Sequence, residues 1–266
     1  MMLKGRSALC NVVLAISLLT LAAGRVCALP DGQPAPALME KHPRALKVLQ
    51  DMGTFLRGLK NLHLIADSDT DQVLDNGQAV QFSYHTELIA TPPDKLRVDV
   101  VDGPHRKTLF YNGKRFVLFD QGQRYYASGN APSTIDGLLA DMNQRYGIVL
   151  PLADLFRWNK GTADEVGINS ALYINDQEID GKLCAHYAYR QPGVDWQLWV
   201  HLGPRPLPCQ LVIVRQDLEA MPRHSVRYHW MEDKAAPASA YEFVPPAGVQ
   251  AVPLRELAPT DPQVQP

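Results

Sequence analysis

The feature that most constrains this chain is an alternation of apolar and polar residues with a period of two. It is clearest in residues 80–88 and 95–100. Successive side chains of a β-strand point to opposite faces, so the pattern predicts strands, and Gly-containing turns such as Asn112-Gly113 separate them. We expect strands at 80–88, 95–100, 107–111, 115–119, 124–127, 171–178, 182–190, 195–202, 208–216 and 225–232.

Helical spacing of apolar residues indicates three helices among these strands. The first begins near Pro43, which suits a first helical turn, and ends near Gly58. The second runs from a cap at Ser133 to Tyr146, and the third runs from Leu152 to Trp158 behind Pro151. One helix with an apolar face therefore precedes the strands, and two more are inserted between them.

Several of the expected strands are apolar on both faces. Residues 115–119 and 211–214 have apolar side chains at successive positions, and Trp196 and Trp199 point to opposite faces. An antiparallel sheet with one face in water would alternate cleanly, so these strands need cover on both sides. Ten or more strands would curl strongly or close into a barrel, with the helices inside or across the hollow.

The first 28 residues have the layout of a secretory signal peptide. Lys4 and Arg6 precede an apolar run over 12–23. Val26-Cys27-Ala28 then supplies small residues at the −3 and −1 positions of a cleavage site. The run is short for a membrane span, although an uncleaved anchor and a lipoprotein at Cys27 remain alternatives. We expect an exported protein that begins near Leu29, and residues 29–37 form its flexible start.

Charge and cysteine content narrow the classes further. Removal of the leader leaves 23 basic against 28 acidic residues, a net charge of −5, and no basic stripe suits nucleic acid. Only Cys184 and Cys209 remain outside the leader. Regular hairpins would place both opposite His201 on one intervening strand, roughly 9–10 Å apart, which exceeds the reach of a disulfide. We therefore expect two free thiols.

No catalytic, nucleotide or metal motif is found in the sequence, so no cofactor is predicted. His224 and His229 are five apart, which puts them on opposite faces of a strand, and both are expected to face solvent. The aspartates of 67–75 lack the glycine and terminal glutamate of an EF-hand and indicate a solvated strand or turn.

Four segments resemble the LolA/LolB/LppX/RseB type of bacterial envelope carriers and sensors. They are Pro93–Val98, Tyr111–Phe116 with Tyr125-Tyr126, Trp196–Val200 with Pro206–Pro208, and Phe243–Gly248. Residues 40–255 are similar to a group of predicted periplasmic proteins within that fold, including its inserted segment at 146–155. The resemblance implies a mainly β (α+β) fold, a strongly curved, unclosed antiparallel barrel with an N-terminal helix and two inserted lid helices.

The expected domain is a single half-barrel over residues 38–255 with a disordered tail at 256–266. We expect a non-enzymatic periplasmic protein that binds an acyl chain, a lipid or a lipoprotein in the hollow. Docking of a partner envelope protein on the sheet and a hydrolase without a known motif are the alternatives. The residues expected to contact the ligand are Phe82, Tyr84, Val98, Leu138, Leu139, Met142, Trp158 and Trp199.

Overall fold

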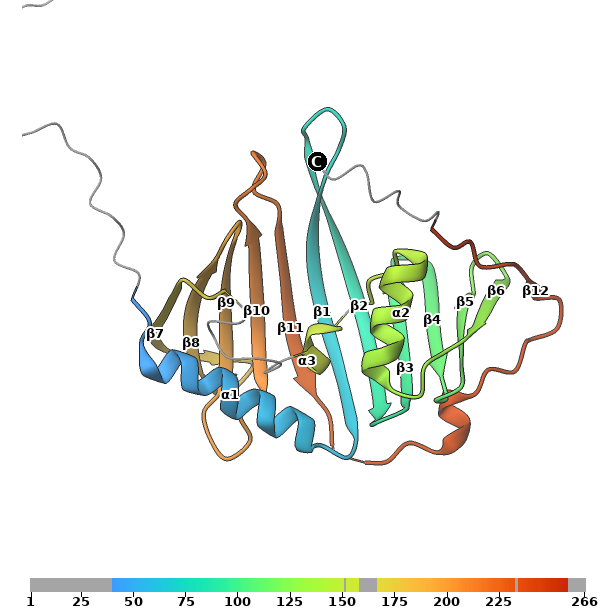
Figure 1. Ribbon diagram of the computed structural model, residues 1–266, viewed down its shortest axis with the longest axis horizontal. Coiled ribbons are helices and arrows are strands. Elements are labelled where there is room, and N and C mark those ends of the chain that lie inside the picture. The colour runs from blue at the N-terminus through green and yellow to red at the C-terminus, as the bar shows by residue number, and fades with distance from the viewer. Residues whose placement is uncertain (1–39, 151, 158–166, 233, 258–266) are drawn as a thin grey trace, which may run out of the picture. The chain divides into compact units, whose positions relative to one another are not determined.

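The computed structural model describes residues 40–150, 152–157, 167–232 and 234–257. Within these ranges, a 12-stranded sheet runs in the order β12-β6-β5-β4-β3-β2-β1-β11-β10-β9-β8-β7 (Figure 1). The strands are β1 (Leu62–Val73), β2 (Ala79–Thr91), β3 (Lys95–Asp102), β4 (His105–Tyr111), β5 (Arg115–Asp120), β6 (Tyr125–Asn130), β7 (Ser170–Ile179), β8 (Lys182–Gln191), β9 (Val194–His201), β10 (Pro208–Arg215), β11 (Arg223–Trp230) and β12 (Gln250–Ala251).

Two antiparallel meanders make up the sheet. Strands β1 to β6 and strands β7 to β11 each pair in chain order, and β1 pairs with β11 to join the two halves. The strands at the two ends of the order, β12 and β7, are not paired with each other. The expected mainly β, curved and unclosed fold is therefore confirmed.

Three helices lie on the same face of the sheet, called here the helix-covered face (Figure 1). They are α1 (Pro43–Gly58), α2 (Ile135–Tyr146) and α3 (Asp154–Arg157), and a 3-10 turn spans Ala238–Tyr241. Thr134, not Ser133, caps α2, because its hydroxyl accepts from the Gly137 amide at 3.1 Å. The helix α3 is shorter than the predicted span, and Pro151 and Trp158 lie outside the described residues.

The core lies between these helices and the sheet. Met52 of α1 and Leu138 and Met142 of α2 are fully buried there, against strand residues such as Leu64 and Leu88. Strand alternation assigns even-numbered residues of β1 and β2 to this face. Each fully buried apolar side chain of this size stabilises the fold by about 1.5–3 kcal/mol.

The C-terminal segment covers part of the opposite face, called the rear face. Phe243 packs against Phe110, Phe119 and Tyr126, with ring centroids 5.0–5.4 Å apart. On the helix-covered side of β5, the strand that carries Phe119, the ring of Phe116 packs against Tyr146 of α2. The segment then forms β12, which pairs in parallel with β6. This arrangement explains why 115–119 is apolar on both faces. Glu256 and Leu257 contact Arg145 at the end of α2.

The expectation of two free thiols is wrong, because Cys184 and Cys209 form a disulfide with a Cα–Cα distance of 6.7 Å. Cys184 does lie opposite His201, as predicted. Cys209 does not, because a β-bulge in β10 inserts it between Pro208, paired with Val200, and the next paired residue. A bulge bends its strand, and here it accompanies a separation below that of regular strands.

Candidate functional site

A band of half-buried residues crosses the four central strands on the helix-covered face. Cross-strand pairing joins Phe82 to Thr70, Thr70 to His224, and His224 to Ile213. The neighbouring row begins with Tyr84, which lies opposite Ser68. We call Phe82, Tyr84, Thr70, His224 and Ile213 the central band. In Figure 1, no helix lies in front of the upper halves of β10, β11, β1 and β2.

The sheet becomes fully buried below the central band. Thr86, Ala66 and Tyr228 form the next row by their pairing, and each is at most 5% exposed. Leu152 and Leu155, in and beside α3, belong to the same core cluster. The band therefore forms the exposed margin of a continuous apolar surface that the helices otherwise cover.

The one hydrogen bond within the band joins His224 Nδ1 and Thr70 Oγ1 at 2.7 Å. Burial lowers the pKa of His224, and the nearby carboxylate of Asp154 opposes this effect. A neutral imidazole has one donor nitrogen and one acceptor nitrogen. Among the described residues, Nε2 of His224 has no hydrogen-bond partner, so it could bind a polar group of a ligand.

Burial also raises the pKa of Tyr228 well above its usual range, and the charge of Asp154 acts in the same direction. The shared influence of Asp154 places the start of α3 close to both β11 residues, Tyr228 and His224. The lowered pKa of His224 favours its neutral form at pH 7, where a tyrosine is neutral in any case. The chemistry of the surface is therefore apolar, with one neutral hydrogen-bonding pair.

The structure brings most of the predicted ligand-contacting residues to this face. Phe82 and Tyr84 belong to the central band, and Val98 is buried on the same face opposite Leu88. Leu138, Leu139 and Met142 are buried in the contact between α2 and the sheet. Trp158 lies outside the described residues.

Trp199 is separated from this group on the rear face. It stacks on His186 with ring centroids 4.0 Å apart, and its indole N–H donates to Gln177 at 2.7 Å. Trp196 faces the helices instead and lies opposite Ile213 of the band. Alternation placed the two tryptophans on opposite faces but did not show which face was covered.

The sequence did not single out Thr70 or Ile213, and His224 was expected in solvent. Thr70 and Ile213 are each an even number of positions from buried apolar residues of their own strand, so they lie on the same face as those residues. His224 was wrongly placed because nothing local showed that β11 lies beside β1. Histidine burial here depends on pairing between strands about 150 residues apart in the chain.

The described residues contain no group of three or more His, Cys, Asp or Glu side chains suited to a metal ion. No helix in the described ranges is long and apolar enough to span a bilayer. These observations leave the central band as the surface with the most distinctive composition on the helix-covered side.

The model of a family described as "Predicted periplasmic protein (DUF2092)" matches residues 45–255. No curated protein matches the chain.

The chain is similar to several solved structures. An uncharacterized conserved protein from Thermus thermophilus is 9% identical, with a TM-score of 0.44 over 79% of this chain and 99% of that one. LprF from Mycobacterium bovis is 12% identical, with a TM-score of 0.42 over 79% and 99%. LppX from Mycobacterium tuberculosis is 12% identical, with a TM-score of 0.38 over 74% and 100%.

Proposed function

The chain belongs to the family of predicted periplasmic proteins DUF2092, and we propose that it is a non-enzymatic binding protein of the periplasm. Its ligand is an acyl chain, or the acyl part of a lipid or lipoprotein, which lies along the central band. The supporting observation is that Phe82, Tyr84 and Ile213 are half-buried on the helix-covered face, whereas the apolar residues of the neighbouring helix α2 are already buried in the core.

The central band has the composition that an acyl chain requires. Aromatic and aliphatic side chains supply contact area, and His224 with Thr70 supplies one polar contact for a head group. Each methylene that leaves water on this surface contributes about 0.8 kcal/mol. A few methylenes therefore give measurable affinity without displacement of any helix.

The helices serve as walls of this site. Leu138 and Met142 are 0% exposed, so α2 is fixed by the core and does not have to open. Under this proposal Val98, Leu138, Leu139 and Met142 support the wall, and Phe82 and Tyr84 contact the ligand. Trp158, the remaining helix-side residue predicted from the sequence, lies outside the described residues.

Export is part of the same proposal. A leader that ends at Ala28 would release a chain that begins near Leu29 into the periplasm. Terminal sequencing of the exported protein should give a residue at or near Leu29. A chain that keeps Met1 in the membrane fraction would contradict the proposal.

Displacement of a fluorescent fatty acid tests the binding site. We expect the double variant Phe82→Ser/Tyr84→Ser to lose about tenfold in affinity, because two of the contacting rings are removed. The matched control is Leu183→Ser, which removes an exposed apolar side chain from β8, far along the sheet. Circular dichroism should be the same for all three proteins.

Equal affinity in the wild type and the double variant would contradict the assignment of the band. If the wild type takes up no fatty acid, the alternative that we proposed from sequence, docking of a partner protein on the sheet, replaces it. A pull-down with envelope proteins would then identify the partner, and the same variants would map the surface.

A further inference from the structure

A cavity of about 210 Å³ lies where β10 and β11 separate. The last pair between these strands is Gln210 with Arg227. Beyond it, Pro208 has no amide hydrogen to donate, and Cys209 lies at a bulge in the neighbouring β9–β10 ladder. The indole N–H of Trp230 bridges the gap by donating to the Pro208 carbonyl at 2.8 Å.

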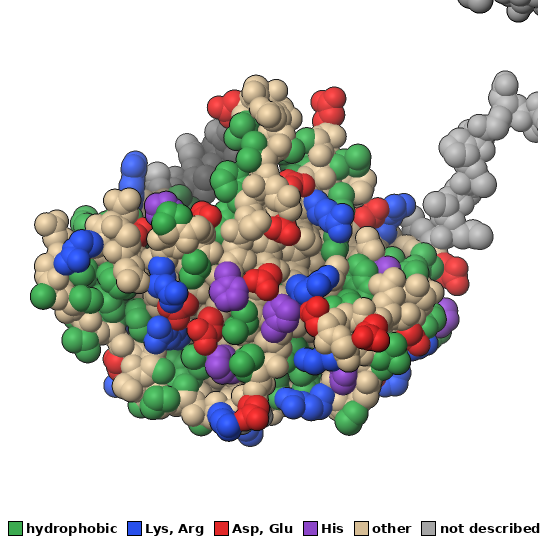
Figure 2. Space-filling view, turned by 180° about the vertical axis from the view of Figure 1, so that it is seen from behind, with side chains coloured by type: hydrophobic (Ala, Val, Ile, Leu, Met, Phe, Trp, Pro, Cys, Tyr) green, Lys and Arg blue, Asp and Glu red, His purple; other side chains and the backbone are tan. Residues whose placement is uncertain are grey.

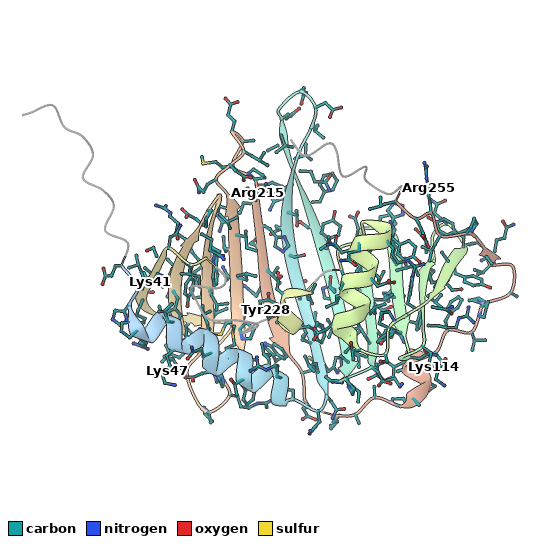
Figure 3. All side chains as sticks on the ribbon, in the orientation of Figure 1. Lys41, Lys47, Lys114, Arg215, Tyr228 and Arg255 are labelled. Atoms are coloured by element: carbon teal, nitrogen blue, oxygen red, sulfur yellow. A yellow bond between two sulfur atoms is a disulfide. The ribbon has the colours of Figure 1, made fainter. Side chains whose placement is uncertain are left out.

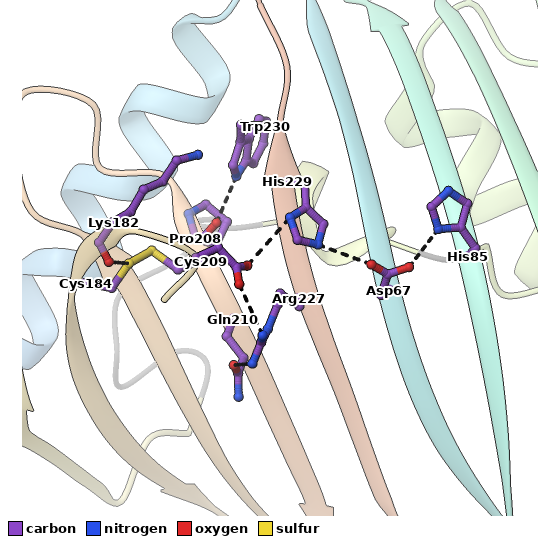
Figure 4. Close-up of polar contacts among 11 residues, drawn as sticks. Asp67, His85, Lys182, Cys184, Pro208, Cys209, Gln210, Arg227, His229 and Trp230 are labelled. Carbon is purple, nitrogen blue, oxygen red and sulfur yellow. Dashed lines mark hydrogen bonds and ion pairs between the residues drawn. A yellow bond between two sulfur atoms is a disulfide. The ribbon is translucent and has the colours of Figure 1, made fainter. Parts of the chain in front are cut away.

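The floor of this cavity is apolar and largely buried. Cys209 is part of the wall, and its disulfide to Cys184 ties β10 to β8 beside the gap (Figure 4). The volume lies below the roughly 300–1,000 Å³ of sites for drug-sized ligands, so the occupant is small. The apolar lining consists mainly of Ile179, Leu207, Pro208, Cys209, Tyr228 and Trp230.

The rim of the cavity carries two positively charged side chains that form no ion pair with the one acid of the lining. Lys182 and Arg205 line it, and neither has a carboxylate partner among the described residues. The acid of the lining, Asp180, is already engaged by Arg227 at 3.3 Å and by His229 at 3.6 Å. His229 in turn contacts Asp67, which also binds His85 (Figure 4).

Histidines and acidic residues gather on the rear face, which Figure 2 shows as purple and red side chains close together. Their charges are paired with one another, whereas those of Lys182 and Arg205 are not. A chain with a net charge of −2 therefore presents two unpaired cations beside one apolar cavity. These two positive charges favour the binding of an anion and disfavour the binding of a cation.

We propose that this cavity binds a small amphiphilic carboxylate, with its compact apolar group in the gap and its carboxylate between Lys182 and Arg205. The site is independent of the acyl site proposed above. The cavity lies beside Cys209 at the start of β10 and Trp230 at the end of β11, whereas the central band crosses these two strands at Ile213 and His224.

Calorimetric titration with 4-phenylbutyrate, 4-phenylbutanol and 4-phenylbutylammonium tests whether the affinity of the cavity depends on the charge of the ligand's head group. The three probes share their apolar part and differ in the head group. We expect the alcohol to bind about tenfold more weakly than the acid, since two exposed ion pairs are lost, and the ammonium to bind more weakly still. Equal affinity for acid and alcohol, or no binding of the acid at millimolar concentration, would overturn the proposal.

Charge reversal then locates the site. Lys182→Glu/Arg205→Glu should lower the affinity for the acid about tenfold or more. The control Arg106→Glu/Lys114→Glu makes the same change in charge on the other half of the sheet and should leave the affinity unchanged. All four side chains are exposed, and thermal melting checks that the variants fold.

The Phe82→Ser/Tyr84→Ser variant separates the two sites. It should bind 4-phenylbutyrate as the wild type does. A loss of affinity in this variant together with an unaffected Lys182→Glu/Arg205→Glu variant would place the ligand on the central band and overturn the assignment to the gap.

Discussion

Cys184 on β8 and Cys209 on β10 are bonded to each other although β9 lies between their strands. The bulge at Cys209 takes it out of the regular ladder and places its Cα 6.7 Å from that of Cys184. The bond lies on the rear face, in a small cluster with Trp199 and Val212. The disulfide therefore fixes, on the rear face, the β10 edge of the gap between β10 and β11.

Removal of this disulfide should destabilise the protein. The cysteines are 25 residues apart, and a loop of that length corresponds to about 3.5 kcal/mol of stabilisation. We expect Cys184→Ala/Cys209→Ala to lower the free energy of unfolding by about that amount in urea. Thiol counting on the denatured exported protein should give no free thiol, and two free thiols would contradict the bond.

Phe243 should anchor the C-terminal segment to the rear face. Its ring contacts three aromatic rings of β4, β5 and β6. Phe243→Ala should therefore reduce the free energy of unfolding by about 3 kcal/mol. The adjacent Val244 is 82% exposed, so Val244→Ala should change it by less than about 0.5 kcal/mol. Similar values for the two variants would show that the segment is not packed as described.

The helix α2 should behave as part of the core. Leu138 is 0% exposed, and its truncation leaves a cavity between the helix and the sheet. Leu138→Ala should cost about 2–5 kcal/mol. Val149, just beyond the helix, is 73% exposed, and Val149→Ala should be close to neutral. A small effect at Leu138 would indicate a helix that moves freely from the sheet.

Stability should fall as the pH drops below about 6.5. Burial lowers the folded-state pKa of His224, which the charge of Asp154 opposes, and that of His186, which the hydrogen bond that His186 donates to the Gln197 side-chain oxygen opposes. Between the lowered pKa and the ordinary value, the unfolded chain binds more protons, so acid favours unfolding.

Urea unfolding at pH 7 and pH 5 measures this dependence. His224→Gln should reduce the difference in stability between the two pH values. The exposed His105 is the control, and His105→Gln should leave that difference unchanged. An unchanged difference in the His224 variant would mean that His224 is not buried on the helix-covered face.

Local patterns predicted the strands because alternation is a property of neighbouring residues. The segments 80–88 and 95–100 lie within β2 and β3. The pairing of β1 with β11 joins residues such as Leu64 and Trp230, and no local pattern reports it. The bulge at Cys209 depends on Pro208 and on the fit of β10 against β9, so a regular hairpin register gave the wrong thiol state.

The central band could be predicted only in part for the same reason. Alternation placed Phe82 and Tyr84 on one face of β2, where the structure has them. It could not decide between Trp196 and Trp199, because both faces of β9 carry buried side chains. His224 and Thr70 come together only through the β1–β11 pairing. Figure 3 labels Tyr228 of the same strand as His224, which lies near α3.

Native mass spectrometry of the exported protein, purified without detergent, measures acyl-chain binding on the central band. We expect the wild type to take up one palmitate when titrated and Phe82→Ser/Tyr84→Ser to take up much less under the same conditions. The Leu183→Ser control should match the wild type. A wild type that stays unliganded throughout the titration, or a double variant that binds palmitate as well as the wild type does, would show that the central band is not an acyl-chain site.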